Sequence, residues 1–217
     1  PLFTKLRTHR KIDPLNVVTS NLPPELSNAG LLYDGSEERR SNYTLEGGDV
    51  HYLRPDLLVV GFSERTSPAA LDLLCDTVFE RGQVTDVLVV VMPKAPTAIH
   101  LDMIFNQVDH ELCVVYPPYF VGPERLPVIH RRKGSDGVVE QPDFFAALRQ
   151  VAMPLEPVFA GGERRINQER EQWSSACNFL AVRPGIVLSY PDSELLALVA
   201  AAPPRRNDRP PRVACSI

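Results

Sequence analysis

The alternation of hydrophobic and polar positions divides the central part of the chain into short strands and helices. Residues 56–61 form an almost continuous apolar run that ends in a glycine, which is typical of a buried strand. Ser67 and Pro68 fit the N-cap and first turn of a helix, and Gly82 fits its end. Residues 84–92 form the next apolar run. The pattern therefore predicts a strand, a helix and a second strand in succession.

The following segment alternates in a way that predicts a half-buried hairpin. Residues 98–107 place apolar side chains at every second position, and residues 112–116 form an apolar partner after a turn at 109–111. On a strand, residues two apart point to the same side, so His100 and Asp102 are expected to share one face.

The rest of the chain has shorter and less regular patterns. Residues 1–40 predict loops with short elements, residues 117–141 form a Pro- and Gly-rich stretch, and residues 203–212 predict a surface loop or tail. No internal repeat is visible from residue identity, and the expected class is mixed α/β. The further expected elements are helices at 144–151 (capped by Asp143), 166–173 and 192–201, a strand that passes into a loop within 158–162, and a hairpin of 178–182 with 186–190.

Composition narrows the range of functions. The chain has 217 residues, of which 44% are hydrophobic and 23% charged, as in ordinary globular domains. The 21 prolines favour short elements joined by stiff loops over a bundle of long helices. A net charge of −4 argues against a nucleic-acid partner. No apolar run approaches the roughly 18 residues that a membrane span needs, so no membrane partner is expected.

The four cysteines show no close or patterned spacing. Metal sites and disulfide frameworks usually carry such spacing, so reduced thiols in a cytoplasmic protein are expected, with no metal. Cys75 and Cys113 lie in apolar surroundings and are interpreted as core residues. Cys177 and Cys215 are the other two thiols.

Three local patterns concentrate polar side chains that could carry chemistry. Glu46 and Asp49 enclose a Gly-Gly pair, where they could receive a cation or form an acid/base pair, or simply be solvated acids of a tight turn. His100 beside Asp102 suits a general acid, or else a polar strand face in water. Arg65 follows an apolar strand and could clamp a carboxylate, or form an ion pair in an ordinary loop.

Taken in order, these patterns resemble the arginine deiminase family of guanidino-modifying enzymes. The likeness covers about residues 42–116 and 165–191. Several ordered motifs are a stronger signal than any one of them alone. They are Leu45-Glu-Gly-Gly-Asp-Val50, Gly61-Phe-Ser-Glu-Arg-Thr66, His100-Leu-Asp-Met-Ile-Phe105, Glu169-Arg-Glu-Gln-Trp173 and the stretch from Asn178 to Tyr190.

The resemblance implies a pentein-type β/α propeller built from ββαβ-like blades. Residues 1–217 would be a single guanidino-modifying catalytic domain that is partial at the N-terminus. The implied reaction is hydrolysis of L-arginine to L-citrulline and ammonia through a covalent cysteine thioether, with no metal or organic cofactor. The implied partner is the small guanidino substrate, and a homo-oligomer is left open.

The resemblance also implies roles for particular residues. The catalytic residues would be Cys215 as nucleophile, His100 as acid and base, and Glu46 as support for His100 and the guanidinium. Asp102 would grip the guanidinium and Arg65 the substrate carboxylate. Asp49 matches the second acid of its motif, either among the substrate-binding residues or as a structural residue.

Two segments depart from the family pattern. Phe3-Thr4-Lys5-Leu6 lacks the guanidinium-binding aspartate expected in such a segment, and the Gly-rich loop expected before Cys215 is absent. Cys177 therefore stays as a second candidate nucleophile. Two alternative functions also stay open. One is a related amidinotransferase or methylarginine hydrolase, and the other is a non-catalytic binding protein on the same fold.

Overall fold

The computed structural model describes residues 43–189 and the backbone of a strand at 212–215. Strands predominate, with three longer helices and three short 3-10 turns among the described residues. In chain order the elements are η1 (Gly47–Asp49), β1 (Val50–Arg54), β2 (Leu57–Phe62), α3 (Pro68–Arg81), β3 (Asp86–Val91), η2 (Leu101–Met103), β4 (Phe105–Asp109), β5 (Leu112–Val115), η3 (Pro117–Tyr119), β6 (Val128–Arg132), β7 (Val138–Gln141), α4 (Phe144–Gln150), β8 (Glu156–Phe159), α5 (Arg165–Trp173), β9 (Leu180–Arg183), β10 (Ile186–Ser189) and β11 (Arg212–Cys215).

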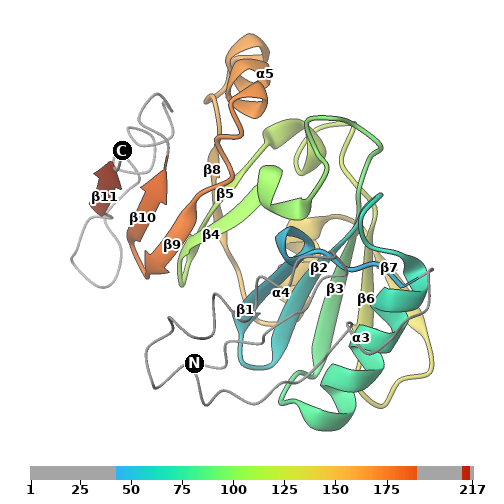
Figure 1. The fold of residues 1–217 in the computed structure, drawn as a ribbon. Coiled ribbons are helices and arrows are strands. Elements are labelled where there is room, and N and C mark those ends of the chain that lie inside the picture. Colours follow the sequence, from blue (N-terminus) through green and yellow to red (C-terminus); the bar gives the residue numbers. More distant parts are fainter. Residues whose placement is uncertain (1–42, 190–211, 216–217) are drawn as a thin grey trace, which may run out of the picture.

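Three sheets share one strand topology (Figure 1). In the first, β1 and β2 form an antiparallel hairpin, and β3 returns parallel to β2 after α3. The strands β4, β5 and β8 repeat this arrangement, and so do β9, β10 and β11. The strands β6 and β7 extend the first sheet beyond β3. A repeat of strand pairing does not require a repeat of residue identity, so the sequence alone did not show it.

The helix α3 begins and ends where the sequence predicts. Ser67 caps its first turn by accepting a hydrogen bond from the Ala70 amide, Pro68 occupies the first position, and Gly82 follows its end. Leu74 is 1% exposed and belongs to the core between α3 and one face of β2 and β3. Burying a leucine side chain in this way stabilises the fold by about 1.5–3 kcal/mol. The predicted Cys75 also lies in this core.

A second core lies on the opposite face of β2 and β3. Phe105 at the start of β4 is completely buried, and its ring packs edge-to-face against that of Phe144 in α4. Phe120 completes the aromatic group, with its ring centroid 5.1 Å from that of Phe144. Cys113 is buried in the same core, as expected, and so is Cys177. Because both faces of β2 and β3 are covered, these two strands are almost wholly apolar.

Most of the remaining predicted elements are confirmed within a few residues. The β4–β5 hairpin turns at residues 109–111, and the β9–β10 hairpin encloses the predicted turn at 183–185. Asp143 caps α4, and β8 and α5 lie at the predicted positions. The predicted loops at 1–40, the helix at 192–201 and residues 203–211 lie outside the described residues. No helix of the described part is both long and apolar enough to span a bilayer.

The Pro- and Gly-rich stretch 117–141, in which the sequence pattern predicted no element, contains β6 and β7. β6 pairs antiparallel with β3, and His130 points into a buried position where its Nε2 lies 2.7 Å from Asp86 Oδ1. Arg132 donates a further hydrogen bond to the same Asp86 oxygen over 2.9 Å. A buried histidine at an inward position interrupts the alternation of apolar and polar residues by which strands are recognised.

The expectation of a strand throughout residues 98–107 is wrong in its first part. Residues 101–103 form the 3-10 turn η2, and β4 begins only at Phe105. The amide of Leu101 donates a hydrogen bond of 3.0 Å to the Asp49 carboxylate instead of joining a strand ladder. Strand alternation therefore does not set the directions of His100 and Asp102, and a turn held by a distant carboxylate does so instead.

Candidate active site

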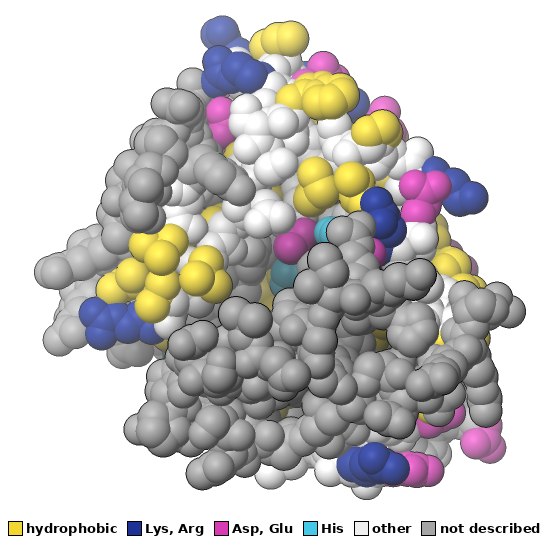
Figure 2. All heavy atoms as spheres, viewed as in Figure 1, with side chains coloured by type: hydrophobic (Ala, Val, Ile, Leu, Met, Phe, Trp, Pro, Cys, Tyr) yellow, Lys and Arg dark blue, Asp and Glu magenta, His cyan; other side chains and the backbone are white. Residues whose placement is uncertain are grey.

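Three of the predicted site residues are in direct contact. The His100 Nε2 atom lies 2.6 Å from Glu46 Oε2, and Arg65 Nη1 lies 3.5 Å from the other Glu46 oxygen. Glu46 precedes η1, Arg65 follows β2 and His100 precedes η2, so three separate loops supply the group. Figure 2 shows acidic and histidine side chains together in a hollow near the middle of one face. The resemblance implied that Glu46 supports His100, and the structure places these two side chains in contact, whereas the contact of Arg65 with Glu46 was not predicted.

The Glu46–His100 pair is only partly shielded from water. The side chains of His100 and Glu46 are 25% and 28% exposed, and that of Arg65 is 43% exposed. A small molecule can therefore reach these groups. The contact also orients the imidazole, because it engages one of the two ring nitrogens with the carboxylate.

Asp49 is the buried member of the group. Its Oδ2 accepts hydrogen bonds from Ser63 Oγ over 2.6 Å and from Thr66 Oγ1 over 2.7 Å, while Oδ1 accepts from the Leu101 amide. Burial raises the pKa of this carboxyl, while the three hydrogen bonds favour the ionised form. Asp49 has no exposed surface, which favours a structural role over contact with a substrate.

Asp102 has a carboxylate oxygen that lacks a partner. Its Oδ1 is buried and accepts no hydrogen bond from any described residue. Burial, together with the nearby negative charge of Asp49, raises the pKa of Asp102 to about 6, and the charge of His100 acts in the opposite direction. A buried carboxylate oxygen without a donor is costly for the fold and is available to a cationic ligand.

Two glycines make the close approach of these segments possible. A Cβ atom on Gly48 would lie 2.8 Å from Asp102 Oδ2 and 3.0 Å from His100 Cβ. A Cβ atom on Gly61 would lie 2.5 Å from Asp49 Oδ1. Both contacts are closer than side chains allow, so the absence of a Cβ is what admits Asp102 and Asp49 at these places.

His51 contacts the backbone of the Glu46–Asp49 turn. Its Nε2 lies 3.3 Å from the Gly48 carbonyl oxygen, and its ring contacts that of Phe105 edge-on with centroids 5.4 Å apart. Burial lowers the pKa of His51 to about 4, so the ring is neutral near pH 7. Sequence reasoning did not single out this histidine, which borders the first motif but lies outside its quoted residues.

The two candidate nucleophiles differ in what the structure says of them. Cys215 ends β11, where its backbone pairs with Ser189 of β10, and its side chain lies outside the described residues. Cys177 is completely buried, and burial raises the pKa of its thiol strongly. A buried thiol that resists ionisation is a poor nucleophile, so the structure favours a core role for Cys177.

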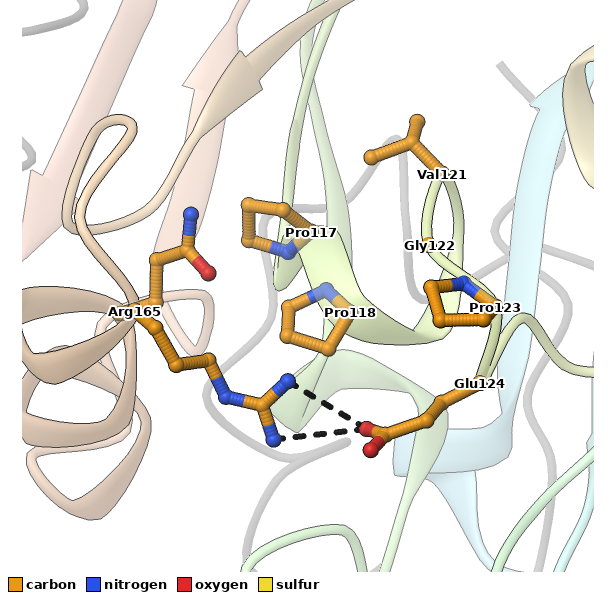
Figure 3. A pocket seen from close by; sticks show the side chains of 8 residues that line it. Pro117, Pro118, Val121, Gly122, Pro123, Glu124 and Arg165 are labelled. Atoms are coloured by element: carbon orange, nitrogen blue, oxygen red, sulfur yellow. Dashed lines mark hydrogen bonds and ion pairs between the residues drawn. The ribbon is translucent and has the colours of Figure 1, made fainter.

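A hydrogen bond from α5 reaches the segment that precedes His100, and a second hollow lies elsewhere on the protein. Gln172 of α5 is buried, and its Nε2 donates a hydrogen bond to the carbonyl oxygen of Thr97, three residues before His100. A separate hollow is lined by prolines and by the Arg165–Glu124 ion pair (Figure 3). This hollow contains none of the predicted site residues. No cluster of metal-ligating side chains occurs within the described part of the chain.

The structure thus brings together Glu46, His100 and Arg65 by contact, with Asp102 and Asp49 beside them. The sequence analysis did not assign roles to Ser63 and Thr66, although both belong to the quoted Gly61–Thr66 motif. The sequence feature that could have indicated a role for Ser63 and Thr66 is their position in a polar motif directly after a buried strand. That motif became informative only when the structure placed Asp49 against both hydroxyl groups.

The fold and this group of side chains define an α/β protein with a partly open, acid-rich site that contains a histidine and an arginine. Comparison with known proteins gives the family. The arginine deiminase family model matches residues 19–195, and the chain belongs to this family.

The relatives are arginine deiminases of bacteria. The chain is 35% identical to that of Rhodococcus jostii over 146 residues, which are 67% of this chain and 36% of the relative. It is 36% identical to that of Rhodococcus erythropolis over 149 residues, with the same shares. It is 34% identical to that of Listeria welshimeri over 173 residues, or 77% of this chain and 42% of the relative. The chain therefore matches less than half the length of these relatives.

Proposed function

We propose that this protein hydrolyses the guanidinium group of L-arginine to give L-citrulline and ammonia. The observation that carries the proposal is the contact of His100 with Glu46 beside the unpartnered buried oxygen of Asp102. This arrangement combines a proton-transfer group with carboxylates that can bind a planar cation. The names of the relatives support arginine as the substrate.

In this proposal Asp102 and Glu46 bind the guanidinium. A guanidinium carbon is a weak electrophile because its charge is delocalised, so attack requires a fixed orientation. The carboxylates supply that orientation by accepting paired hydrogen bonds from the guanidinium nitrogens. The partner that Asp102 Oδ1 lacks among the described residues is then a substrate N–H group.

The Cys215 thiolate attacks the guanidinium carbon and forms a carbon–sulfur bond. His100 gives a proton to one nitrogen of the tetrahedral adduct, and ammonia leaves as the carbon–nitrogen bond breaks. The product of this step is a covalent amidino-thioether. His100 next takes a proton from water, the oxygen attacks the same carbon, and the thiolate leaves to release L-citrulline. Apart from this water, the protein's own side chains supply the reacting groups of this proposed sequence.

Arg65 binds the α-carboxylate of the substrate in this proposal. Its guanidinium lies at the edge of the group, with 43% of the side chain exposed and a 3.5 Å contact to Glu46. An exposed pair at that distance is weak, so a substrate carboxylate can compete for Arg65 with two parallel hydrogen bonds.

We also propose that the three hairpin-plus-parallel-strand units are blades of a pentein-type propeller. Their identical strand order supports this arrangement. The site residues would then lie in loops that enter and leave neighbouring blades. The protein would work in the cytoplasm on a small guanidino substrate.

Product analysis tests the proposed function. The protein is incubated separately with L-arginine and with N-methylated arginines, and citrulline and the released amine are measured. We expect citrulline and ammonia from L-arginine. Release from methylated arginines alone would instead indicate a methylarginine hydrolase, and transfer of the amidino group to an added amine would indicate an amidinotransferase. Binding of L-arginine without turnover would indicate a non-catalytic binding protein.

A further inference from the structure

We infer that Asp49 is a positioning residue that fixes the positions of His100 and Asp102 relative to Glu46 and Arg65. In this role Asp49 does not touch the substrate. The inference rests on the proposed function, because it concerns the same group of side chains. It assigns a separate task to the one acid of the site that is wholly buried.

The carboxylate of Asp49 joins all three loops that supply the site. Asp49 itself ends η1, which begins directly after the loop residue Glu46. Ser63 and Thr66 belong to the loop that carries Arg65, and their hydroxyl groups both donate to Asp49 Oδ2. The Leu101 amide donates to Oδ1 from the loop that carries His100 and Asp102. A single side chain therefore sets the spacing of three segments.

The bond to Leu101 acts directly on the proposed functional groups. His100 and Asp102 are the neighbours of Leu101 on either side, and the Leu101 side chain is itself completely buried. The hydrogen bond to Asp49 fixes the Leu101 amide, and burial in the core fixes the Leu101 side chain. His100 and Asp102 are thereby held in place from the residue between them.

The chemistry of the contact requires a carboxylate. Two hydroxyl groups and one amide all donate to Asp49, and an ionised carboxylate is a side chain that offers acceptors only. An asparagine at this position would direct its own NH₂ group against at least one of these donors. Gly61 completes the arrangement, since any Cβ there would lie 2.5 Å from Asp49 Oδ1.

Thr66 offers a more discriminating test than Asp49. Replacing Asp49 would leave three donors without this acceptor, two of them buried, and endanger the fold. Thr66→Val removes only one donor at almost constant shape, and Thr66→Ser keeps that donor. Neither variant alters a group that touches the substrate. The pair therefore separates loss of the hydrogen bond from a change of side-chain packing.

Two measurements are made on the 217-residue chain and on both variants. The first is hydrogen exchange of the Leu101 amide, and the second is the rate of citrulline formation with kcat and KM determined separately. In Thr66→Val we expect exchange at Leu101 to become about tenfold faster and kcat to fall about tenfold, as for loss of a charge-assisted hydrogen bond. In Thr66→Ser we expect both to stay within about twofold of the parent, because the hydroxyl donor remains.

The failures of the two proposals are distinguishable. Equal Leu101 exchange in the two variants would overturn the positioning role, and so would faster exchange in Thr66→Val with an unchanged kcat. Absence of citrulline from the parent chain would contradict the proposed function instead. In that case the dissociation constant for L-arginine replaces kcat, and an equal constant in both variants would overturn the positioning role.

Discussion

His100 and Glu46 are 54 positions apart in the sequence, yet His100 Nε2 lies 2.6 Å from Glu46 Oε2. The two residues belong to different loops, one before β1 and the other before β4. In the proposed function, this contact makes two separate motifs into one proton-transfer unit beside the Asp102 carboxylate.

Replacement of His100 by alanine should abolish turnover without unfolding the protein. A general acid and base contributes roughly 10²–10⁴-fold to a rate, and the His100 side chain is partly exposed, so its loss creates no large cavity. Citrulline formation and circular dichroism measure the two effects. His110→Ala is the matched control, because His110 is exposed in the turn between β4 and β5. An undiminished kcat in His100→Ala would refute the acid/base role.

Gly48→Ala should impair the site, whereas Gly47→Ala should not. A Cβ on Gly48 would lie 2.8 Å from Asp102 Oδ2, but a Cβ on Gly47 would meet nothing within 4 Å. We expect kcat/KM for L-arginine to fall by at least about tenfold in Gly48→Ala, because small displacements of catalytic geometry are costly. Steady-state kinetics of the adjacent pair provide the comparison. Equal activities would show that Asp102 has room to move without consequence.

Asp102→Asn should make the protein more stable at pH 8 while it removes arginine binding. The pKa of Asp102 is raised from 3.8 to about 6, so the folded state holds the proton more tightly than the unfolded state. The resulting stability is present below pH 4 and is lost as pH rises through 6. Two pKa units correspond to at most about 3 kcal/mol.

Urea unfolding at pH 4 and pH 8 tests the Asp102 prediction. We expect Asp102→Asn to exceed the parent by about 1–3 kcal/mol at pH 8 and to match it near pH 4. Arginine binding by the parent should also weaken as pH falls below about 6, because protonated Asp102 carries no charge. If Asp102→Asn is less stable than the parent at pH 8, the Asp102 carboxylate has a stabilising partner, and the prediction is wrong.

His51→Gln should make the protein less sensitive to acid. The pKa of His51 is lowered from 6.5 to about 4, so the unfolded state binds the proton more tightly. Stability from neutral His51 is therefore present above pH 6.5 and is lost as pH falls through 4. Glutamine can still donate to the Gly48 carbonyl but does not titrate.

The measurement for His51 is the free energy of unfolding between pH 7 and pH 4. We expect the loss over this range to be about 1–3 kcal/mol smaller in His51→Gln than in the parent. His110→Gln controls for the general loss of a histidine, since His110 is exposed. If His51→Gln and His110→Gln behave alike, His51 does not carry the acid sensitivity.

Thiol labelling should single out Cys215. Burial raises the pKa of Cys75 to about 11, and it also raises that of Cys177; Cys113 is completely buried. These three thiols should react slowly in the folded protein. We expect one fast-reacting thiol, which is absent in Cys215→Ser and is protected by L-arginine. Four sluggish thiols would favour a non-catalytic protein, and fast labelling of Cys177 would contradict its core role.

Local sequence information determined much of the fold. The apolar runs of β2 and β3 and the cap, proline and glycine of α3 are all local signals, and the structure confirms them. The same holds for the hairpins β4–β5 and β9–β10, whose turns lie at predicted positions. Such elements depend on neighbouring residues, so their pattern is visible without a structure. The five described site residues were also named from their motifs, although their roles remain predictions.

The tertiary structure decided what these motifs do together. Polar pairing hid β6 from pattern analysis, and the remote Asp49 carboxylate converted an expected strand around His100 into a turn. Contacts of this kind join residues about 50 positions apart, and burial by distant segments sets their pKa values. Local periodicity records neither effect. The sequence by itself therefore identified the chemical groups, and only the folded chain determined their contacts, their exposure to water and their charge.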